Sequence, residues 1–271
     1  MTKKLSPREE KFKQRLQSTL TSEDVSHIVR AKRVFRMLPR DPRCKNCFVP
    51  FEGTGGWLAK ALFNQERSAL NPLICNTCEE GFKQFQLSVE VKMSMLFADI
   101  RGSTPLAESM DAKEFRDLID RFYSATTHTL IHNDALIDKL VGDEVSAVFL
   151  PSMVGKKFVR KSIETAQEML KALGHTRPEG PWAPVGIGIN TGKAHIGTVG
   201  SLEGMADLTV LGDEINVASR LASHAKTGEI IISTSTAEGA SWDTSQLETR
   251  TLSLKGKSEP VDVYVLKVQP N

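Results

Sequence analysis

The sequence predicts an α+β fold in which a mixed, mainly antiparallel sheet is covered by helices. From about residue 88 onward, short apolar runs typical of strands alternate with longer segments in which apolar residues recur at helical spacing. Two of the predicted strands are joined by a tight turn, and a hairpin makes its strands antiparallel. Alternating strands and helices combined with a hairpin indicate a mixed sheet with helices packed on it.

Each element is marked by its own pattern. Val89–Phe97 is predicted to be a strand that ends at Asp99, and Asp111 and Glu114 have the spacing of a capping box that opens a helix. That helix carries apolar residues at helical spacing, namely Phe115, Leu118, Ile119, Phe122 and Tyr123. The elements expected after it are strands at 135–140 and 144–150 around a turn at 141–143, a helix at 158–173, a strand at 184–190, a helix at 212–224, and strands at 229–233 and 261–268.

Composition excludes several classes of protein. The chain has 271 residues, of which 40% are hydrophobic and 25% charged, as in ordinary globular proteins. No apolar run approaches the ~18–20 residues of a membrane helix, and the basic start lacks the apolar segment of a signal peptide. We therefore expect a soluble cytoplasmic protein without a membrane partner. In that compartment the four cysteines are not expected to form structural disulfides.

Three domains are predicted: a basic helical leader at 1–42, a four-cysteine module at 43–87 and a larger domain at 88–271. The net charge is +2, but residues 1–43 hold 12 of the 35 Lys and Arg side chains. A basic leader can contact nucleic acid or another acidic surface. A solvated helix or a partly disordered arm is the more common explanation of such a charge run, so nucleic-acid binding is not expected.

Two Cys-x-x-Cys motifs predict a metal site with four thiolate ligands, Cys44, Cys47, Cys75 and Cys78. Zinc is the usual metal, but Phe48 and Glu79 stand where zinc knuckles often have glycine, and the gap between the motifs exceeds the usual ~15–20 residues. The segment is also rich in aromatic residues, including Trp57 and Phe63, which suits a cluster that needs a dry shell. We expect a [4Fe-4S] cluster, with a structural zinc ion as the alternative.

Four further motifs carry groups that suit nucleotide chemistry. They are the stretch 97–104 with Asp99, the stretch 138–144 with Lys139 and Asp143, the stretch 209–220, and Leu254-Lys-Gly-Lys at 254–257. Asn216 and Arg220 lie four residues apart on a predicted helix and therefore share a face, where an amide and a guanidinium suit a ribose and a phosphate. Each motif taken alone is also explained by a turn or an exposed polar surface.

The order and spacing of these motifs, with Gly-Ile-Asn-Thr-Gly at 188–192 among them, resemble the class III nucleotidyl cyclase catalytic domain over about residues 88–269. The resemblance implies a sheet with a ferredoxin-like core. It implies that Asp99, Asp143 and the Ile100 carbonyl hold two Mg²⁺ or Mn²⁺ ions per active site. It further implies that Asn216 orients the ribose, that Arg220 stabilises charge on the α-phosphoryl group, and that the triphosphate is bound by Lys255 and the turn Gly102, Ser103 and Thr104.

The resemblance also bears on the base. Lys139 stands where lysine marks adenylate cyclases and glutamate marks guanylate cyclases, and an ammonium can donate to adenine N1. Thr209 departs from the aspartate of many members and resembles a Lys/Thr subgroup. Its hydroxyl can accept from the adenine amino group or donate to guanine O6, so Lys139 carries most of the expectation of ATP.

Because the active sites of this family lie between two catalytic domains, and each motif occurs once here, a homodimer is implied. The expected function is therefore conversion of ATP to cyclic AMP and pyrophosphate, regulated by the cysteine module. The alternatives are a guanylate cyclase, a cyclase with a purely structural zinc module, a non-catalytic nucleotide-binding regulator, and a zinc-dependent nucleic-acid binder.

Overall fold

The computed structural model describes residues 10, 14, 42–44, 49–68, 75–77, 88–200 and 206–268. The chain divides into two compact units, the larger made of residues 92–150, 157–194 and 212–271 and the smaller of 1–91, 151–156 and 195–211. The predicted leader helix lies almost wholly outside the described residues. Among the helices that the structure describes, none is long and apolar enough to cross a membrane.

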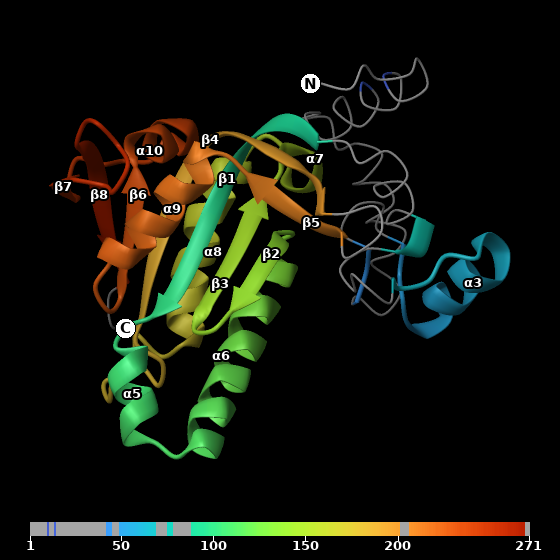
Figure 1. The fold of residues 1–271 in the computed structure, drawn as a ribbon, viewed down its shortest axis with the longest axis horizontal. Helices are drawn as coiled ribbons and strands as arrows, with labels where there is room; N and C mark the ends of the chain where they lie inside the picture. The colour runs from blue at the N-terminus through green and yellow to red at the C-terminus, as the bar shows by residue number, and fades with distance from the viewer. Residues whose placement is uncertain are drawn as a thin grey trace. The chain divides into compact units, whose positions relative to one another are not determined.

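The larger unit is built on a mixed sheet with the strand order β2-β3-β1-β4-β6-β8-β7 (Figure 1). Its strands are β1 (Ser88–Ile100), β2 (Leu136–Val141), β3 (Glu144–Phe149), β4 (Val185–Gly200), β6 (Glu229–Ser233), β7 (Glu248–Leu252) and β8 (Val261–Lys267). The pairs β1–β3, β2–β3, β6–β8 and β7–β8 are antiparallel, whereas β4 and β6 run parallel. The prediction of a mixed, mainly antiparallel sheet is confirmed.

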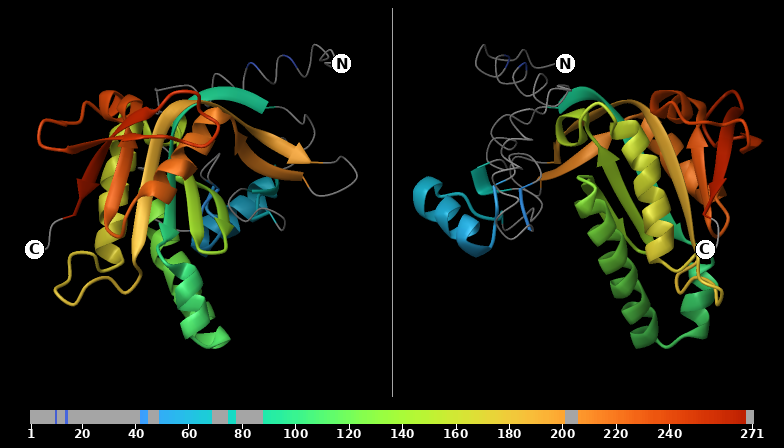
Figure 2. Two further views of the ribbon diagram at one scale, coloured as in Figure 1. Left: turned by 60° about the vertical axis from the view of Figure 1, so that its left-hand side comes forward. Right: turned by 180° about the vertical axis from the view of Figure 1, so that it is seen from behind.

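Helices cover both faces of this sheet (Figures 1 and 2). They are α6 (Ala112–His132), α8 (Phe158–Ala172), α9 (Asp213–His224) and α10 (Thr234–Ala240), whereas α5 (Ser103–Ser109) lies beyond the end of β1 and buries none of its residues. Gly188 of β4 lies against α9, whereas the Thr191 hydroxyl accepts a 3.0 Å hydrogen bond from Thr236 of α10. Because alternate residues of a strand point to opposite faces, α9 and α10 lie on opposite sides of the sheet.

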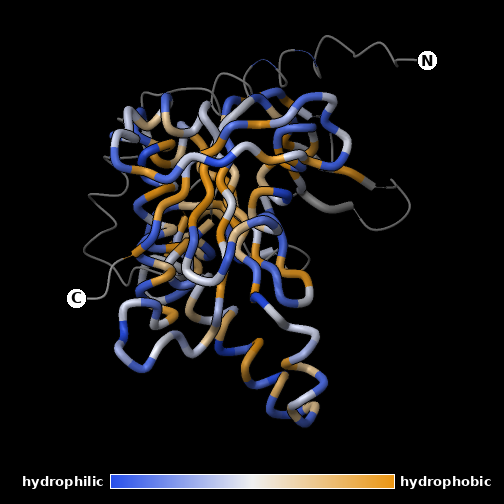
Figure 3. The backbone as a smooth tube through the Cα atoms, turned by 90° about the vertical axis from the view of Figure 1, so that its left-hand side faces the viewer, coloured by the Kyte–Doolittle hydropathy of each residue, from blue (hydrophilic) through white to orange (hydrophobic). Residues whose placement is uncertain are grey.

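The start of α6 follows the predicted capping box. The Asp111 carboxylate accepts from the backbone N–H groups of Lys113 and Glu114, both at 2.8 Å, and the Glu114 side chain accepts from the Asp111 N–H. The hydrophobic core lies along the strands, where Figure 3 shows the apolar residues gathered. All of β6 is buried, as are residues 93–98 of β1. This burial is the main source of the fold's stability.

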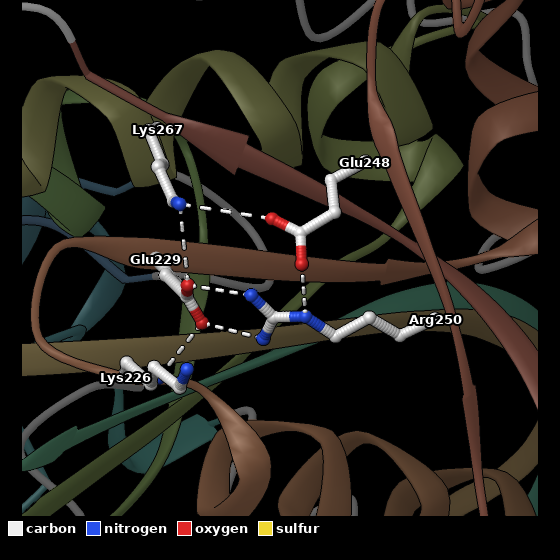
Figure 4. A network of polar contacts seen from close by, with 5 residues as sticks. All are labelled: Lys226, Glu229, Glu248, Arg250 and Lys267. Carbon is white, nitrogen blue, oxygen red and sulfur yellow. Dashed lines mark hydrogen bonds and ion pairs between the residues drawn. The ribbon is translucent and has the colours of Figure 1, made fainter.

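A network of ion pairs and hydrogen bonds links β6, β7 and β8 near one edge of the sheet (Figure 4). Glu229, whose side chain is only 3% exposed, accepts hydrogen bonds of 2.7 and 2.8 Å from the two terminal nitrogens of Arg250. Glu248 accepts a further bond from Arg250 at 2.6 Å, and Lys267 lies 3.6 Å from Glu229. The hydrogen bonds from Arg250 lower the pKa of Glu229 to about 2.

The smaller unit contains α3 (Gly53–Phe63), α7 (Pro151–Val154), the outer half of β4 and β5 (Ala206–Leu211). Residues 195–200 of β4 pair antiparallel with β5. The strand predicted at 184–190 therefore continues ten residues further, through glycine-rich sequence that the periodicity did not mark as a strand. The short elements α3, β5, α7, β7 and α10 were not predicted either.

Candidate active site

The acidic end of the sheet brings together three of the predicted ligands. Asp99 and Ile100 end β1, and Asp143 lies in the turn between β2 and β3. Antiparallel pairing sets Asp99 opposite Glu144, and the Ile100 N–H donates to the Asp143 carbonyl oxygen at 3.1 Å. The turn requires Gly142, which has a positive φ of 61° that other residues adopt only with strain.

The charges around Asp143 are strongly negative. Burial raises the pKa of Glu144, and the neighbouring charge of Asp143 raises it further. Burial and the charge of Asp143 also raise the pKa of Tyr123, whose hydroxyl donates a 2.7 Å hydrogen bond to the Gly142 carbonyl oxygen. An acidic cluster of this kind is suited to a bound cation.

The donor set fits Mg²⁺ or Mn²⁺. The carboxylates of Asp99 and Asp143 and the Ile100 carbonyl are hard oxygen ligands, and magnesium in phosphate-handling sites uses one or two carboxylates together with substrate phosphates. In the part of the chain that the structure describes, no three His, Cys, Asp or Glu side chains gather as a complete metal cage.

Arg101 lies inside this acidic cluster. Its Nη2 pairs with the Asp99 carboxylate, its Nε donates to the Asp99 carbonyl oxygen at 3.3 Å, and its Nη1 donates to the Ser223 carbonyl oxygen at 3.1 Å. Burial lowers the pKa of Arg101, while the charges of Asp143 and Glu144 act in the opposite direction. Arg101 lies within the motif at 97–104, but local spacing does not predict its contacts with Asp99 and Ser223.

The predicted phosphate-binding turn follows β1 directly. Gly102 has a φ of 70° and stands at the N-cap of α5, of which Ser103 and Thr104 are the first residues. A Cβ at Gly102 would meet nothing within 4 Å, so glycine is needed here for its conformation rather than for space. The turn carries the chain sharply from β1 into the helix.

Glycines in β4 allow α9 to lie directly on the sheet. A Cβ at Gly188 would lie 2.5 Å from the Ala218 carbonyl oxygen and closer still to the Ala222 nitrogen. The start of α9 is fixed by Asn190, whose amide donates to the Glu214 carboxylate at 2.7 Å and to its carbonyl oxygen at 2.9 Å. The Gly-Ile-Asn-Thr-Gly motif therefore positions the helix that carries Asn216 and Arg220.

The loop before β8 is held against α9 at both ends. Leu254 is 3% exposed and packs in a hydrophobic cluster with Val217 and Leu221. Lys257 forms an ion pair with Asp213 at the start of the helix. Lys255 lies exposed between these two anchors, which keeps the predicted phosphate-binding lysine next to α9.

The guanidinium of Arg220 lies against the same loop, next to Gly256. A Cβ at Gly256 would come within 3.3 Å of its Nη2, so glycine leaves room for the guanidinium. The Nη1 of Arg220 is buried and has no hydrogen-bond partner among the described residues. A buried donor without an acceptor costs about 1–3 kcal/mol, and this arrangement suits an anionic ligand that supplies the acceptor.

The two residues expected to read the base belong to different compact units. Lys139 is half-buried on β2. The register of β2 with β3 shifts between Ile137 and Lys139. Thr209 is buried on β5, where it pairs with Gly197 of β4. Each therefore lies on a strand rather than on a loop.

The first cysteines of the two Cys-x-x-Cys motifs lie together. Cys44 and Cys75 are both fully buried, and the Cys75 N–H donates to the Cys44 Sγ at 3.3 Å across 31 residues of sequence. Cys47 and Cys78 lie outside the described residues. Trp57 and Phe63 are 70% and 69% exposed, so these two residues do not form the expected dry aromatic shell.

Residues 86–268 match the adenylate and guanylate cyclase catalytic domain family, and the chain belongs to that family. Among solved structures, the adenylyl cyclase CyaB from P. aeruginosa is 30% identical, with a TM-score of 0.58 over 68% of this chain and 97% of that chain. The guanylyl cyclase Cya2 is 26% identical, with a TM-score of 0.60 over 66% of this chain and 92% of that chain. These matches confirm the cyclase-like fold.

Curated relatives include adenylate cyclases. One from Anabaena cylindrica is 28% identical over 231 residues, which cover 78% of this chain and 44% of that protein. A terminal-differentiation-specific adenylate cyclase from Dictyostelium discoideum is 30% identical over 180 residues, which cover 64% of this chain and 8% of that protein. The chain thus spans less than half the length of these relatives.

Proposed function

We propose that this chain is an adenylate cyclase that converts ATP to 3′,5′-cyclic AMP and pyrophosphate in a homodimer. The observation that carries the proposal is the buried, unpartnered Nη1 of Arg220, which lies on the same helix as Asn216. A guanidinium prepared for an acceptor that the described protein does not supply suits the phosphoryl group of a nucleotide. The acidic cluster at Asp99 and Asp143 supplies the matching cation site.

The chain's own residues act by positioning and by charge. Two Mg²⁺ or Mn²⁺ ions held by Asp99, Asp143 and the Ile100 carbonyl would favour ionisation of the ribose 3′-hydroxyl and departure of pyrophosphate. Asn216 orients the ribose so that its 3′-oxygen is in line with the α-phosphate. Arg220 stabilises the negative charge that develops on the α-phosphoryl group, an electrostatic role without proton transfer.

The triphosphate is held by Lys255 and by the turn of Gly102, Ser103 and Thr104. Lys255 is exposed on a loop that is anchored at both ends, so its ammonium can meet the terminal phosphates at little cost in backbone order. Replacing Arg220 with alanine should abolish turnover while leaving the folded state intact. Replacing Lys255 with alanine should mainly raise KM, since it contacts the phosphates rather than the reacting atoms.

ATP is proposed over GTP because of Lys139. Its ammonium can donate to the acceptor N1 of adenine, whereas N1 of guanine is itself a donor. Curated relatives named adenylate cyclases are consistent with this choice, although several of the similar solved structures are guanylyl cyclases. Turnover of ATP and GTP measured side by side, with both Mg²⁺ and Mn²⁺, tests it. A higher kcat/KM for GTP would make the protein a guanylate cyclase instead.

The homodimer is proposed because each motif occurs once in the chain, and we place the metal ligands of one protomer opposite Asn216 and Arg220 of its partner. A mixture of two inactive variants tests this arrangement. Asp99→Asn and Arg220→Ala should each be inactive alone, and mixing should restore activity, because one site of each mixed dimer keeps all its residues. Absence of any recovery in a verified mixed dimer would place all the residues of a site in one chain.

We further propose that the four cysteines bind a [4Fe-4S] cluster, with zinc as the alternative. The support is the contact of Cys44 with Cys75, because an amide N–H donating to a sulfur is typical of metal-bound thiolates. Protein purified without oxygen should show a broad absorption band near ~400 nm together with iron and sulfide. A colourless protein with stoichiometric zinc would instead indicate a structural zinc site.

If the module holds a cluster, its oxidation or loss should change cyclase activity, because Cys78 lies only about ten residues before the first catalytic strand. The comparison needed is the turnover of cluster-loaded and cluster-free protein of equal dimer content. Equal activities would exclude regulation through this module.

A further inference from the structure

Arg101 spans two parts of the larger unit that carry different functional groups. One side of its guanidinium contacts the carboxylate and the carbonyl oxygen of Asp99 at the end of β1. The other side donates to the carbonyl oxygen of Ser223, near the end of α9. The side chain is 21% exposed and the Asp99 side chain 22%, so water screens this ion pair only partly.

The charged groups that face Arg101 are acidic. Asp99 contacts it directly, and the charges of Asp143 and Glu144 act on it across the β1–β3 pair. A guanidinium among three carboxylates offsets part of their mutual repulsion. It lies against the same Asp99 carboxylate that the proposed function assigns to a divalent cation.

We propose that Arg101 is the resident cation of this site and sets its affinity for metal. The inference rests on the proposed function, because it assumes that Asp99 is a metal ligand. A divalent ion must displace the guanidinium from the Asp99 carboxylate, so part of its binding free energy is used to break that ion pair. Arg101 is a positioning residue: it acts on the metal through Asp99 and touches no reacting atom.

The contact with Ser223 can hold the Arg101 side chain after a metal ion has displaced it from the Asp99 carboxylate. Its Nη1 already donates to that carbonyl oxygen, so the guanidinium can leave the carboxylate without becoming fully unpaired. Because the carbonyl belongs to α9, the exchange at Asp99 is linked to the helix that carries Asn216 and Arg220. Metal binding at Asp99 would then affect Asn216 and Arg220 of the same chain, which the proposed dimer places in its other active site.

The test is a titration of the dimer of this 271-residue chain with Mn²⁺ in the absence of nucleotide, followed by the electron paramagnetic resonance signal of free Mn²⁺. The variants are Arg101→Gln, Asp99→Asn and the control Arg160→Gln, which removes an exposed arginine paired with Glu164 on α8. Arg101→Gln should bind Mn²⁺ about tenfold more tightly, since a charge-assisted contact no longer competes. Arg160→Gln should bind like the wild type.

Binding by Arg101→Gln that is equal to or weaker than that of the wild type would overturn the inference. Wild-type binding that Asp99→Asn does not weaken would instead overturn the metal site of the proposed function. Circular dichroism verifies that each variant is folded. If Arg101→Gln does not fold, Arg101→Lys takes its place: it keeps the charge but loses the planar fork, so it should gain about threefold in affinity. No gain in that variant would equally overturn the inference.

Discussion

The hydroxyl of Tyr123 donates a 2.7 Å hydrogen bond to the carbonyl oxygen of Gly142, the residue directly before the proposed metal ligand Asp143. Tyr123 lies on α6, a helix of 21 residues with a complete capping box at its start. The contact therefore joins a two-residue turn to a rigid helix. A turn fixed in this way holds its carboxylate in one position, which reduces the entropy lost when a metal binds.

Tyr123→Phe should raise the Mg²⁺ concentration needed for half-maximal activity by about threefold to tenfold, with little change in kcat at saturating metal. The ring still packs, so the free energy of unfolding should fall by only about 1 kcal/mol. Metal titrations of turnover and urea denaturation measure the two effects. Tyr264→Phe, on β8, is the matched control and should leave the metal dependence unchanged. A fall in kcat at every metal concentration would show that the hydroxyl does more than hold the turn.

Gly188→Ala should destabilise the protein by about 3 kcal/mol, because the added methyl group would meet backbone atoms of α9 that cannot move aside singly. Activity should fall further than stability alone explains, since the displaced helix carries Asn216 and Arg220. Gly239→Ala is the control: its Cβ would meet only Val159 side-chain atoms at 3.4 Å and beyond. Equal stabilities of the two variants would show that the contact between α9 and β4 adjusts freely.

Stability at low pH should depend on Glu229. Its pKa is about 2 in the folded state against a usual 4.5, so its contribution is fully present above pH 4.5 and is lost as the pH falls toward 2. The loss should amount to about 3 kcal/mol, measured as the unfolding free energy in urea across this range.

Glu229→Gln should flatten that pH dependence and should destabilise the protein at neutral pH, because Arg250 loses its buried partner. Glu248→Gln, which changes the exposed member of the same network, should have a much smaller effect. A wild-type slope that survives in Glu229→Gln would assign the acid sensitivity to other carboxylates.

Lys139→Glu should lower kcat/KM for ATP by about tenfold or more and raise the ratio of GTP to ATP turnover, because a carboxylate accepts from guanine N1 and repels adenine N1. Competition assays with both nucleotides measure the ratio. The control Lys193→Glu makes the same change of charge on β4 and should leave the ratio almost unchanged. An unchanged ratio in Lys139→Glu would move base recognition elsewhere in the site.

Periodicity predicted the long elements well because their burial follows a regular pattern. The helices α8 and α9 and the β2–β3 hairpin fall within a residue or two of the predicted bounds, and α6 begins where the capping box predicts. Short elements such as α10 and β7 were missed, since five to seven residues hold too little pattern to be distinguished from loops. The outer part of β4 was missed because its glycines are weak strand formers and its strand state depends on pairing with β5.

For the candidate site, the chemical groups available can be read from local motifs: two carboxylates, an amide, a guanidinium, lysines and two pairs of thiols. Which of these groups meet depends on how the strands and helices pack. Asp99 is brought beside the Asp143 turn by strand pairing, Cys44 lies against Cys75, and Arg101 reaches both Asp99 and Ser223. Such contacts join residues up to 122 positions apart. Local spacing carries no information about them, because they arise from the packing of whole strands and helices.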